Sequence, residues 1–549
     1  MTNTRSPAAD AVPRDRWRDV VIALVLAEIV IVAFAPAFRG GFVLWDDDHY
    51  FLANPHYRGL GPSQLSWMFT VMWGHYMPLT WLSHGLDYVL WGMHPAGYHA
   101  LNVLLHALVT GAAYFVALRL LDAAVAPVSR LALRFAAGVS ALLFAVHPLR
   151  VESVAWITER RDVLCGVFFL GAVLCYLRAV EADAPRRTRW YWWAVALTGL
   201  ALLSKTMAVT LPAVLLLLDV YPLRRLGQGR WTRRELWREK LPFAALSAAA
   251  AGLAIVAQRS VGTLSDLRAV GILERIGLAC YGVVFYAWKT LLPARLSPLY
   301  EAPHDYAGLT PWFLGSGVVV AAVAAALVAG RHRWPGLAAA GAAFVVLLLP
   351  VLGLLHFGLH IAADRNTYFA GLAVAMLAGG VILHLLGAGR SVAVARCTVA
   401  TALAVVLVLS VLTWRQSQVW RDSRTLWAHA LAVSPSSVAH AKVGVLLDEE
   451  GRTEEAIAHF REALRLRPDN AYAENNWGVA LANVWRFSEA IARFEAALRI
   501  QPNYAEAHRN LQLTLVRMAN PLGYLDAHRA GREGVARGAA VSRITPAER

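Results

Sequence analysis

Charged residues are scarce in this chain of 549 residues. Asp, Glu, Lys and Arg make up 16% of it, against roughly 25% in soluble proteins. Hydrophobic residues reach 58%, above the roughly 45–50% of a soluble domain. This balance excludes an ordinary soluble domain and predicts an integral membrane protein.

Cysteine is also rare, with four residues at positions 165, 175, 280 and 397. All four lie in apolar stretches, and no Cys-x-x-Cys pair occurs. A framework of structural disulfides and a zinc site are both disfavoured by this pattern. We therefore expect the cysteines to be small buried hydrophobic residues.

Acidic residues are fewer than basic ones, 37 against 52, which gives a formal net charge of +15. In a membrane protein such an excess belongs in the loops on the cytoplasmic side. No nucleic-acid-binding motif accompanies the charge, so we expect no nucleic-acid partner.

Long apolar runs alternate with short polar segments as far as residue 413. Runs of this length predict membrane-spanning helices, and thus an all-α, polytopic domain with about 11–12 spans over residues 20–413. Residues 1–19 would be a basic cytoplasmic N-terminus, followed by a retained signal-anchor. The apolar runs lie near residues 20–38, 98–121, 131–147, 162–180, 190–204, 206–221, 241–258, 276–292, 311–330, 336–356, 366–387 and 393–413.

The basic segments predict the orientation of these spans. Residues 185–190 and 224–240 should face the cytoplasm, and the long Trp- and His-rich segment 39–94 should face outward. Arginines at 331, 333, 390 and 396 also favour the inside, yet twelve crossings would place them outside. The expected remedy is that 276–292 is re-entrant, or that a neighbouring short helix crosses. The count is then odd, with the C-terminus outside.

The C-terminal part repeats with a period of 34 residues. Gly444 and Gly478, Phe460 and Phe494, and Pro468 and Pro502 are each separated by that distance. Period and residue types are those of tetratricopeptide repeats. We assign residues 414–530 to a tetratricopeptide α-solenoid and 531–549 to a disordered tail.

Three consecutive carboxylates, Asp46, Asp47 and Asp48, follow the first apolar run. A solvated acidic cap is the simpler interpretation. However, aromatic residues surround the trio in the sequence, and a carboxylate held against apolar walls can act as a general base. The trio could also hold a divalent cation, but the sequence pattern does not define a set of metal ligands.

Further charged residues should lie on the same outer side. They could be membrane anchors, but outward positive charge opposes the usual bias and favours an anionic partner such as a phosphate. An unpaired Lys in an apolar hairpin is costly, which points the same way. The residues concerned are His147, Arg150, Glu152, Glu159, Arg160, Arg161, Asp162, Lys205, Asp364 and Arg365.

These motifs, in their order, resemble the transmembrane and tetratricopeptide-repeat O-mannosyltransferases and their bacterial relatives, in the glycosyltransferase-C (GT-C) class. The resemblance covers nearly the whole chain, with two departures at Met77 and Thr206. The matching motifs are the acidic pair with Tyr50, Asn54 and Pro55; Tyr76, Pro78, Leu79 and Thr80; "YHALNVLLHAL"; His147, Pro148, Glu152, Ala155, Arg160 and Asp162; Ser204 and Lys205; and "ADR" with a later Tyr.

The resemblance implies a GT-C-like enzyme that uses a sugar on a polyprenyl phosphate. Asp46 and Asp47 would be the catalytic acidic residues, and Asp47 or Asp46 would act as the base that takes the proton from an acceptor hydroxyl. Arg160, Lys205 and Arg365 would hold the donor phosphate. Asp48, Glu152, His147, Asp162 and Tyr76 would support them, in a bacterial inner membrane.

Two other functions explain part of the sequence. A membrane scaffold that recruits partners explains the repeats, and a transporter of lipid-linked sugars explains the spans and cations. If the protein is a glycosyltransferase, we expect the repeats to lie on the same side of the membrane as Asp47 and to present a protein or glycan acceptor. The alternative is an array inside the cell that binds another partner.

Overall fold

The computed structural model describes residues 16–125, 129–225, 232–260, 271–302, 310–354, 360–387 and 390–520. Most of the basic N-terminus and the predicted tail at 531–549 lie outside these residues. The chain divides into two compact units, Met1–Leu426 and Trp427–Arg549.

Unit 1 is almost entirely helical, as the apolar runs predict. The strands among its described residues form one short antiparallel pair, β1 (Tyr300–Glu301) with β2 (His360–Ala362). Its α-helices are α1 (Arg16–Ala33), α2 (Pro62–Thr70), α3 (Pro78–Trp91), α4 (Pro95–Ala124), α5 (Arg130–Ala145), α6 (Val151–Ala155), α7 (Arg160–Glu181), α8 (Ala184–Ser204), α9 (Leu211–Val220), α10 (Arg233–Ser260), α11 (Ile272–Leu291), α12 (Thr310–Gly330), α13 (Pro335–Leu348), α14 (Ala370–Leu385) and α15 (Val392–Val419). Short 3₁₀ or π turns are η2 (Ala35–Arg39), η3 (Asp48–Leu52), η4 (Pro148–Arg150), η5 (Ile157–Glu159), η6 (Thr206–Thr210), η8 (Leu349–Val351) and η9 (Asp364–Thr367).

Five helices of the described residues are long and apolar enough to cross a membrane, and α5 with the bent segment Pro148–Ala155 makes a sixth candidate. The expected 11–12 spans exceed this count, although every predicted run overlaps at least one helix of the described residues. Charge and length explain the difference. Helix α1 carries four charged residues, α8 opens with arginines, and α11 carries two cations and an acid. Three further apolar helices, at Thr206–Val220, Pro335–Val351 and Ala370–Leu385, are too short.

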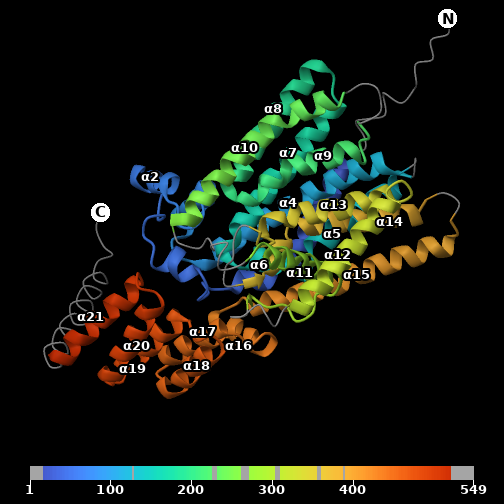
Figure 1. The fold of residues 1–549 in the computed structure, drawn as a ribbon. Helices are drawn as coiled ribbons and strands as arrows, with labels where there is room; N and C mark the ends of the chain where they lie inside the picture. Colours follow the sequence, from blue (N-terminus) through green and yellow to red (C-terminus); the bar gives the residue numbers. More distant parts are fainter. Residues whose placement is uncertain are drawn as a thin grey trace, which may run out of the picture. The chain divides into compact units, whose positions relative to one another are not determined.

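The centre of unit 1 is built from α4, α5, α7 and α14, while α8 and α10 lie side by side at its edge (Figure 1). Small residues allow the central helices to approach closely. A Cβ atom on Gly166 would lie 3.0 Å from Val109, and one on Gly379 would lie 2.9 Å from Ser140. Such contacts between helices are characteristic of membrane proteins, where packing replaces hydrophobic exclusion.

The basic segments meet at one end of unit 1. Arg187 and Arg225 both pair with Glu239, at the start of α10. The turn after Arg333 approaches the same region, since a Cβ on Gly336 would lie 3.2 Å from the Tyr221 hydroxyl. These segments therefore share one end, as expected of loops on one side of a membrane.

Helix α11 has both ends at the opposite end of unit 1, which carries Asp46 and Asp47 and is called the acidic end below. Arg275, near its start, donates to the Leu354 carbonyl, and Thr290, near its end, accepts from His147. Leu354 follows α13 and precedes β2, while His147 begins the bent segment before α6. This is the arrangement expected if 276–292 does not cross.

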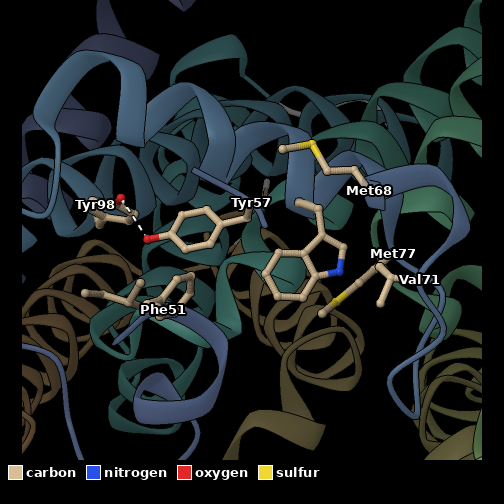
Figure 2. Packing of buried hydrophobic residues seen from close by; sticks show 8 residues of the cluster. Phe51, Tyr57, Met68, Val71, Met77 and Tyr98 are labelled. Atoms are coloured by element: carbon tan, nitrogen blue, oxygen red, sulfur yellow. Dashed lines mark hydrogen bonds between the residues drawn. The ribbon is translucent and has the colours of Figure 1, made fainter. Parts of the chain in front are cut away.

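The segment 39–94 packs around an aromatic core that it shares with Tyr98 of α4 and Ile157 of η5 (Figure 2). Tyr57 and Tyr98 share a hydroxyl hydrogen bond of 3.3 Å, and Phe51 packs edge-on against Tyr57. Met77, one of the departures from the family pattern, is buried in this core with Trp81. The segment is therefore a folded part of unit 1.

Unit 2 consists of paired helices, as the 34-residue period predicts. A Cβ on Gly444 would lie 2.7 Å from Phe460, and one on Gly478 would lie 2.7 Å from Phe494, so each Phe fills the space that a glycine leaves. The division from unit 1 falls within α16 (Ser423–Val433). The other helices are α17 (Ser437–Glu449), α18 (Thr453–Leu466), α19 (Ala471–Asn483), α20 (Phe487–Ile500) and the half-repeat α21 (Ala505–Ala519).

Candidate active site

Asp47 is held in a fixed orientation between two segments of unit 1. Its Oδ2 accepts a hydrogen bond from its own turn, from the Val43 amide at 2.9 Å. Its Oδ1 accepts from the indole of Trp156 at 3.0 Å and from the hydroxyl of Thr158 at 2.6 Å. The side chain is 1% exposed. Asp47 thus joins the acidic segment to the turn between α6 and α7.

Burial raises the pKa of Asp47 to about 7. The neighbouring Asp46 carboxylate adds to this rise, while the hydrogen bonds from Thr158 and Val43 oppose it. A carboxyl with this pKa exchanges its proton near neutral pH.

Asp46 is the more accessible of the pair, with a half-buried side chain. Its carbonyl accepts from the Tyr50 amide at 2.9 Å, and its carboxylate is an electrostatic neighbour of Tyr50 and Arg161. Asp48 instead lies 3.7 Å from the His49 ring. The trio therefore divides into one carboxylate held inside and two nearer the surface.

Glu159, just beyond Thr158, lies at the centre of a cluster of six charged side chains. Lys205 Nζ lies 2.9 Å from Glu159 and 2.8 Å from Asp162. Arg161 also pairs with Glu159, and Arg365 pairs with Glu152 while its Nε lies 3.3 Å from Glu159. We call this set the cation cluster: Glu152, Glu159, Arg161, Asp162, Lys205 and Arg365.

The accessible face of the cation cluster is positive. The side chains of Arg161, Lys205 and Arg365 are 8%, 16% and 12% exposed, whereas the three acids are exposed by 2% or less. The acids hold the cations in place from behind. An anion that reached this face would meet donors that are already oriented, which suits a phosphate.

Arg160 contacts α3 and α4 and is not part of the cation cluster. It is fully buried, with Nε donating to Asn102 at 2.6 Å, one terminal nitrogen to the Tyr98 carbonyl at 2.7 Å, and the other to Asp87. These contacts tie α7 to α3 and α4. Its neighbour Arg161 occupies the position in the cation cluster that the sequence pattern had given to Arg160.

Three other predicted residues have mainly structural contacts. His147 donates to the Thr290 carbonyl at 3.0 Å and caps η4. The Tyr76 hydroxyl donates to the Phe69 carbonyl at 3.2 Å. Asp162, besides its bond to Lys205, accepts from Ser153 at 3.0 Å. His147 and Asp162 brace segments from which the cation cluster is built, whereas Tyr76 braces the turn between α2 and α3.

No metal centre is evident in the part of the chain that the structure describes. Among those residues, no group of three or more His, Cys, Asp or Glu side chains is arranged to hold an ion. The carboxylates of Asp47 and Asp48 make different contacts, one with Trp156 and Thr158 and the other with His49.

Sequence reasoning named Glu159 and Arg161 only as charged residues of the segment 147–164 and gave them no role in the site. It missed Trp156 and Thr158. All four lie within the charged segment 147–164, so its composition was the available signal. Whether Arg160 or Arg161 faces the cluster depends on the turn from η5 into α7, which spacing alone does not reveal.

Comparison with known proteins fits both parts of the chain. A family model described as TPR repeat matches residues 447–484. The human protein O-mannosyl-transferase TMTC1 is 27% identical over 514 residues, covering 83% of this chain and 56% of that protein. Human TMTC4 is 28% identical over 506 residues, covering 80% and 65%.

The chain is a distant homologue of the transmembrane and tetratricopeptide-repeat O-mannosyltransferases. It is a multi-pass membrane protein with a tetratricopeptide repeat. Human TMTC2 is more similar locally, 36% identical over 153 residues, which is 28% of this chain and 17% of that protein. The chain spans between half and two thirds of the length of the TMTC1 and TMTC4 proteins it matches.

Two solved GT-C-type structures align loosely with the chain. The Archaeoglobus fulgidus oligosaccharyltransferase in its apo form covers 73% of this chain and 56% of its own, at 13% identity and a TM-score of 0.39. ArnT from Cupriavidus metallidurans, solved with undecaprenyl phosphate, covers 92% and 79%, at 15% identity and a TM-score of 0.34.

Proposed function

We propose that this chain is a membrane-embedded glycosyltransferase that moves a mannose-like sugar from a polyprenyl-phosphate donor to an acceptor hydroxyl. Transfer takes place on the extracytoplasmic side, in a bacterial inner membrane, and protein Ser or Thr is the preferred kind of acceptor. The observation that carries the proposal is the junction of the acidic segment with the cation cluster: Asp47 accepts from Thr158, next to Glu159, around which the cations gather.

The chemistry follows from this arrangement. A carboxylate of the acidic pair takes the proton of the acceptor hydroxyl, and the oxygen forms a bond to the anomeric carbon. The bond from that carbon to the phosphate oxygen breaks, and its electron pair leaves with the polyprenyl phosphate. We assign the proton transfer to Asp46, which is accessible, while the buried Asp47 fixes the turn that carries it.

The departing phosphate gains negative charge as its bond to the sugar breaks. Arg161, Lys205 and Arg365 are held against buried acids and offer their exposed sides to that charge. Oriented charges of this kind lower the barrier without having to reorganise during the reaction. Arg160 supports the site through its contacts with α3 and α4. We therefore assign the phosphate contact predicted for Arg160 to Arg161 instead.

The test is to incubate purified protein with mannose, glucose and galactose on polyprenyl phosphate, together with a Thr-containing peptide. The proposal expects release of polyprenyl phosphate and a peptide heavier by one hexose. If no donor releases lipid phosphate under conditions where the protein stays folded, the glycosyltransferase assignment is wrong.

The repeats have a role consistent with this reaction. The segment that leads into them ends at the acidic end: the Gly41 amide donates to the Arg421 carbonyl at 2.8 Å, and Trp156 stacks on Trp420 at 5.6 Å. We therefore propose that the repeats lie on the side of Asp47 and present the acceptor, raising its local concentration. A reporter fused after Met518 tests this; activity only as a cytoplasmic fusion would exclude it.

A further inference from the structure

Trp73 is an exposed aromatic residue held firmly by its neighbours, in the turn between α2 and α3. Its ring is 43% exposed. It packs edge-on against Trp67 with ring centroids 5.7 Å apart, and Trp67 in turn packs on Trp81 at 5.0 Å. Trp81 belongs to the aromatic core of Figure 2. The exposed indole is thus packed on one side against Trp67, which itself contacts the buried Trp81.

Tyr50 connects this indole to the candidate active site. The rings of Tyr50 and Trp73 lie 6.3 Å apart. The Tyr50 amide donates to the Asp46 carbonyl, so Tyr50 lies one turn after the acid. Its phenol is an electrostatic neighbour of Asp46 and Arg161. Burial, together with the Asp46 carboxylate, raises the pKa of Tyr50 to about 12, so its phenol stays neutral near pH 7.

The proposed reaction restricts where the transferred sugar can lie. Its anomeric carbon must be between the cations that hold the phosphate and the carboxylate that takes the acceptor's proton. Tyr50 neighbours one member of each group, Arg161 and Asp46, and Trp73 is the next ring outward. Ligand sites combine a few oriented polar groups with aromatic walls of this kind.

We propose that Trp73 lies against the ring of the transferred sugar and strengthens the binding of the donor through it. This inference rests on the glycosyltransferase proposal above. The apolar face of a hexose is rigid and presents C–H groups, and a fixed indole offers it a large contact area at little cost in side-chain entropy.

A membrane anchor is the alternative role for an exposed Trp in such a segment. Trp91 fits that role, because it is 52% exposed beside Leu86, Val89 and Leu90, which are also exposed on α3. Trp73 instead contacts Tyr50 and Trp67. Trp91 is therefore a matched control from the same segment.

The experiment measures initial rates with polyprenyl-phosphate mannose and a Thr-containing peptide, and inhibition by polyprenyl phosphate, which has no sugar. Trp73→Ala should raise the KM for the donor about tenfold, and Trp73→Phe by much less, since Phe keeps an aromatic face. The inhibition constant of polyprenyl phosphate and the KM for the peptide should not change. Trp91→Ala should leave the donor KM, the inhibition constant of polyprenyl phosphate and the peptide KM unchanged.

Three outcomes would overturn the inference. An unchanged donor KM in Trp73→Ala would show that the indole does not contact the sugar. Equal weakening of donor and of polyprenyl phosphate would show that Trp73 only supports the phosphate site. A shift confined to the peptide KM would place it on the acceptor. Failure of the glycosyltransferase proposal itself would look different from these three outcomes. In that case no donor would react with the unsubstituted protein, or Asp46→Asn would transfer sugar as well as the unsubstituted protein does.

Discussion

Helix α7 carries a buried ion cluster at each end, and the two differ in a way that separates structure from function. At the acidic end is the cation cluster around Glu159. At the other end, Asp219 and Glu239 face Arg225 and Lys240 around the hydroxyl of Tyr176. Lys240 lies 2.7 Å from Asp219 and 2.6 Å from the Tyr176 hydroxyl. This second set is called the Tyr176 cluster.

The exposed members of the two clusters have opposite charge. In the Tyr176 cluster the cations are 5% exposed or less, and the acid Glu239 reaches 12%. In the cation cluster the acids are covered and the cations reach the surface. The Tyr176 cluster satisfies its own charges and joins α7, α9 and α10. The cation cluster retains donors for an anion, so accessibility, more than the number of ion pairs, indicates function.

The largest expected effect concerns the acid beside the cation cluster. Asp46→Asn should lower kcat by roughly 10²–10⁴-fold, the usual contribution of a general base, because the amide cannot take the acceptor's proton. The measurement is the rate of transfer from polyprenyl-phosphate mannose, with the thermal midpoint as a folding control. The matched variant Asp48→Asn should have little effect. Near-normal turnover in an Asp46→Asn/Asp47→Asn double variant would contradict the mechanism.

A variant in the Tyr176 cluster should act on stability alone. Lys240→Ala removes one cation from buried Asp219, and breaking a buried pair costs about 3–5 kcal/mol. We expect a lower thermal midpoint, with kcat/KM unchanged for the protein that remains folded. A change in donor KM without any loss of stability would mean that the two clusters do not differ as described.

A smaller effect should appear in the pH dependence of stability. The pKa of Asp47 rises from 3.8 to about 7 in the folded protein, so folded Asp47 keeps a proton that the unfolded chain has lost between these values. Its contribution to stability is therefore full below about pH 4 and is lost as the pH rises towards 7. Asp47→Asn should remove this slope. Parallel curves of thermal midpoint against pH for the variant and the unsubstituted protein would contradict it.

Much of the architecture follows from patterns along the chain. The apolar runs predict helical segments, and the glycines and phenylalanines at 34-residue spacing predict the pairs α17–α18 and α19–α20, because close helix crossings require small residues opposite large ones. The length and charge of each run also indicate whether its helix can cross the membrane. The charges of the loops made α11 a doubtful span, and in the structure both of its ends contact the acidic end.

The sequence does not reveal which charged neighbour faces the site. Arg160 and Arg161 are adjacent and chemically equal, and their roles depend on contacts far along the chain. Arg160 pairs with Asp87, 73 positions away, whereas Arg161 meets Glu159, which also binds Lys205 and Arg365. Local spacing carries no information about such long-range partners. The acidic pair was identifiable because it stands alone after an apolar run.

The most direct test of the difference between the clusters is equilibrium binding of polyprenyl phosphate to the purified protein in lipid nanodiscs. The unsubstituted protein should bind it, and Lys205→Ala and Arg365→Ala should each weaken binding by roughly 10–150-fold, since a hydrogen bond to a charged group contributes about 1.5–3 kcal/mol. Arg365→Lys should lose less, and Lys240→Ala in the Tyr176 cluster should bind as tightly as the unsubstituted protein. Equal affinity in all of these variants, or equal loss from both clusters, would contradict the assignment of the cation cluster to the donor phosphate.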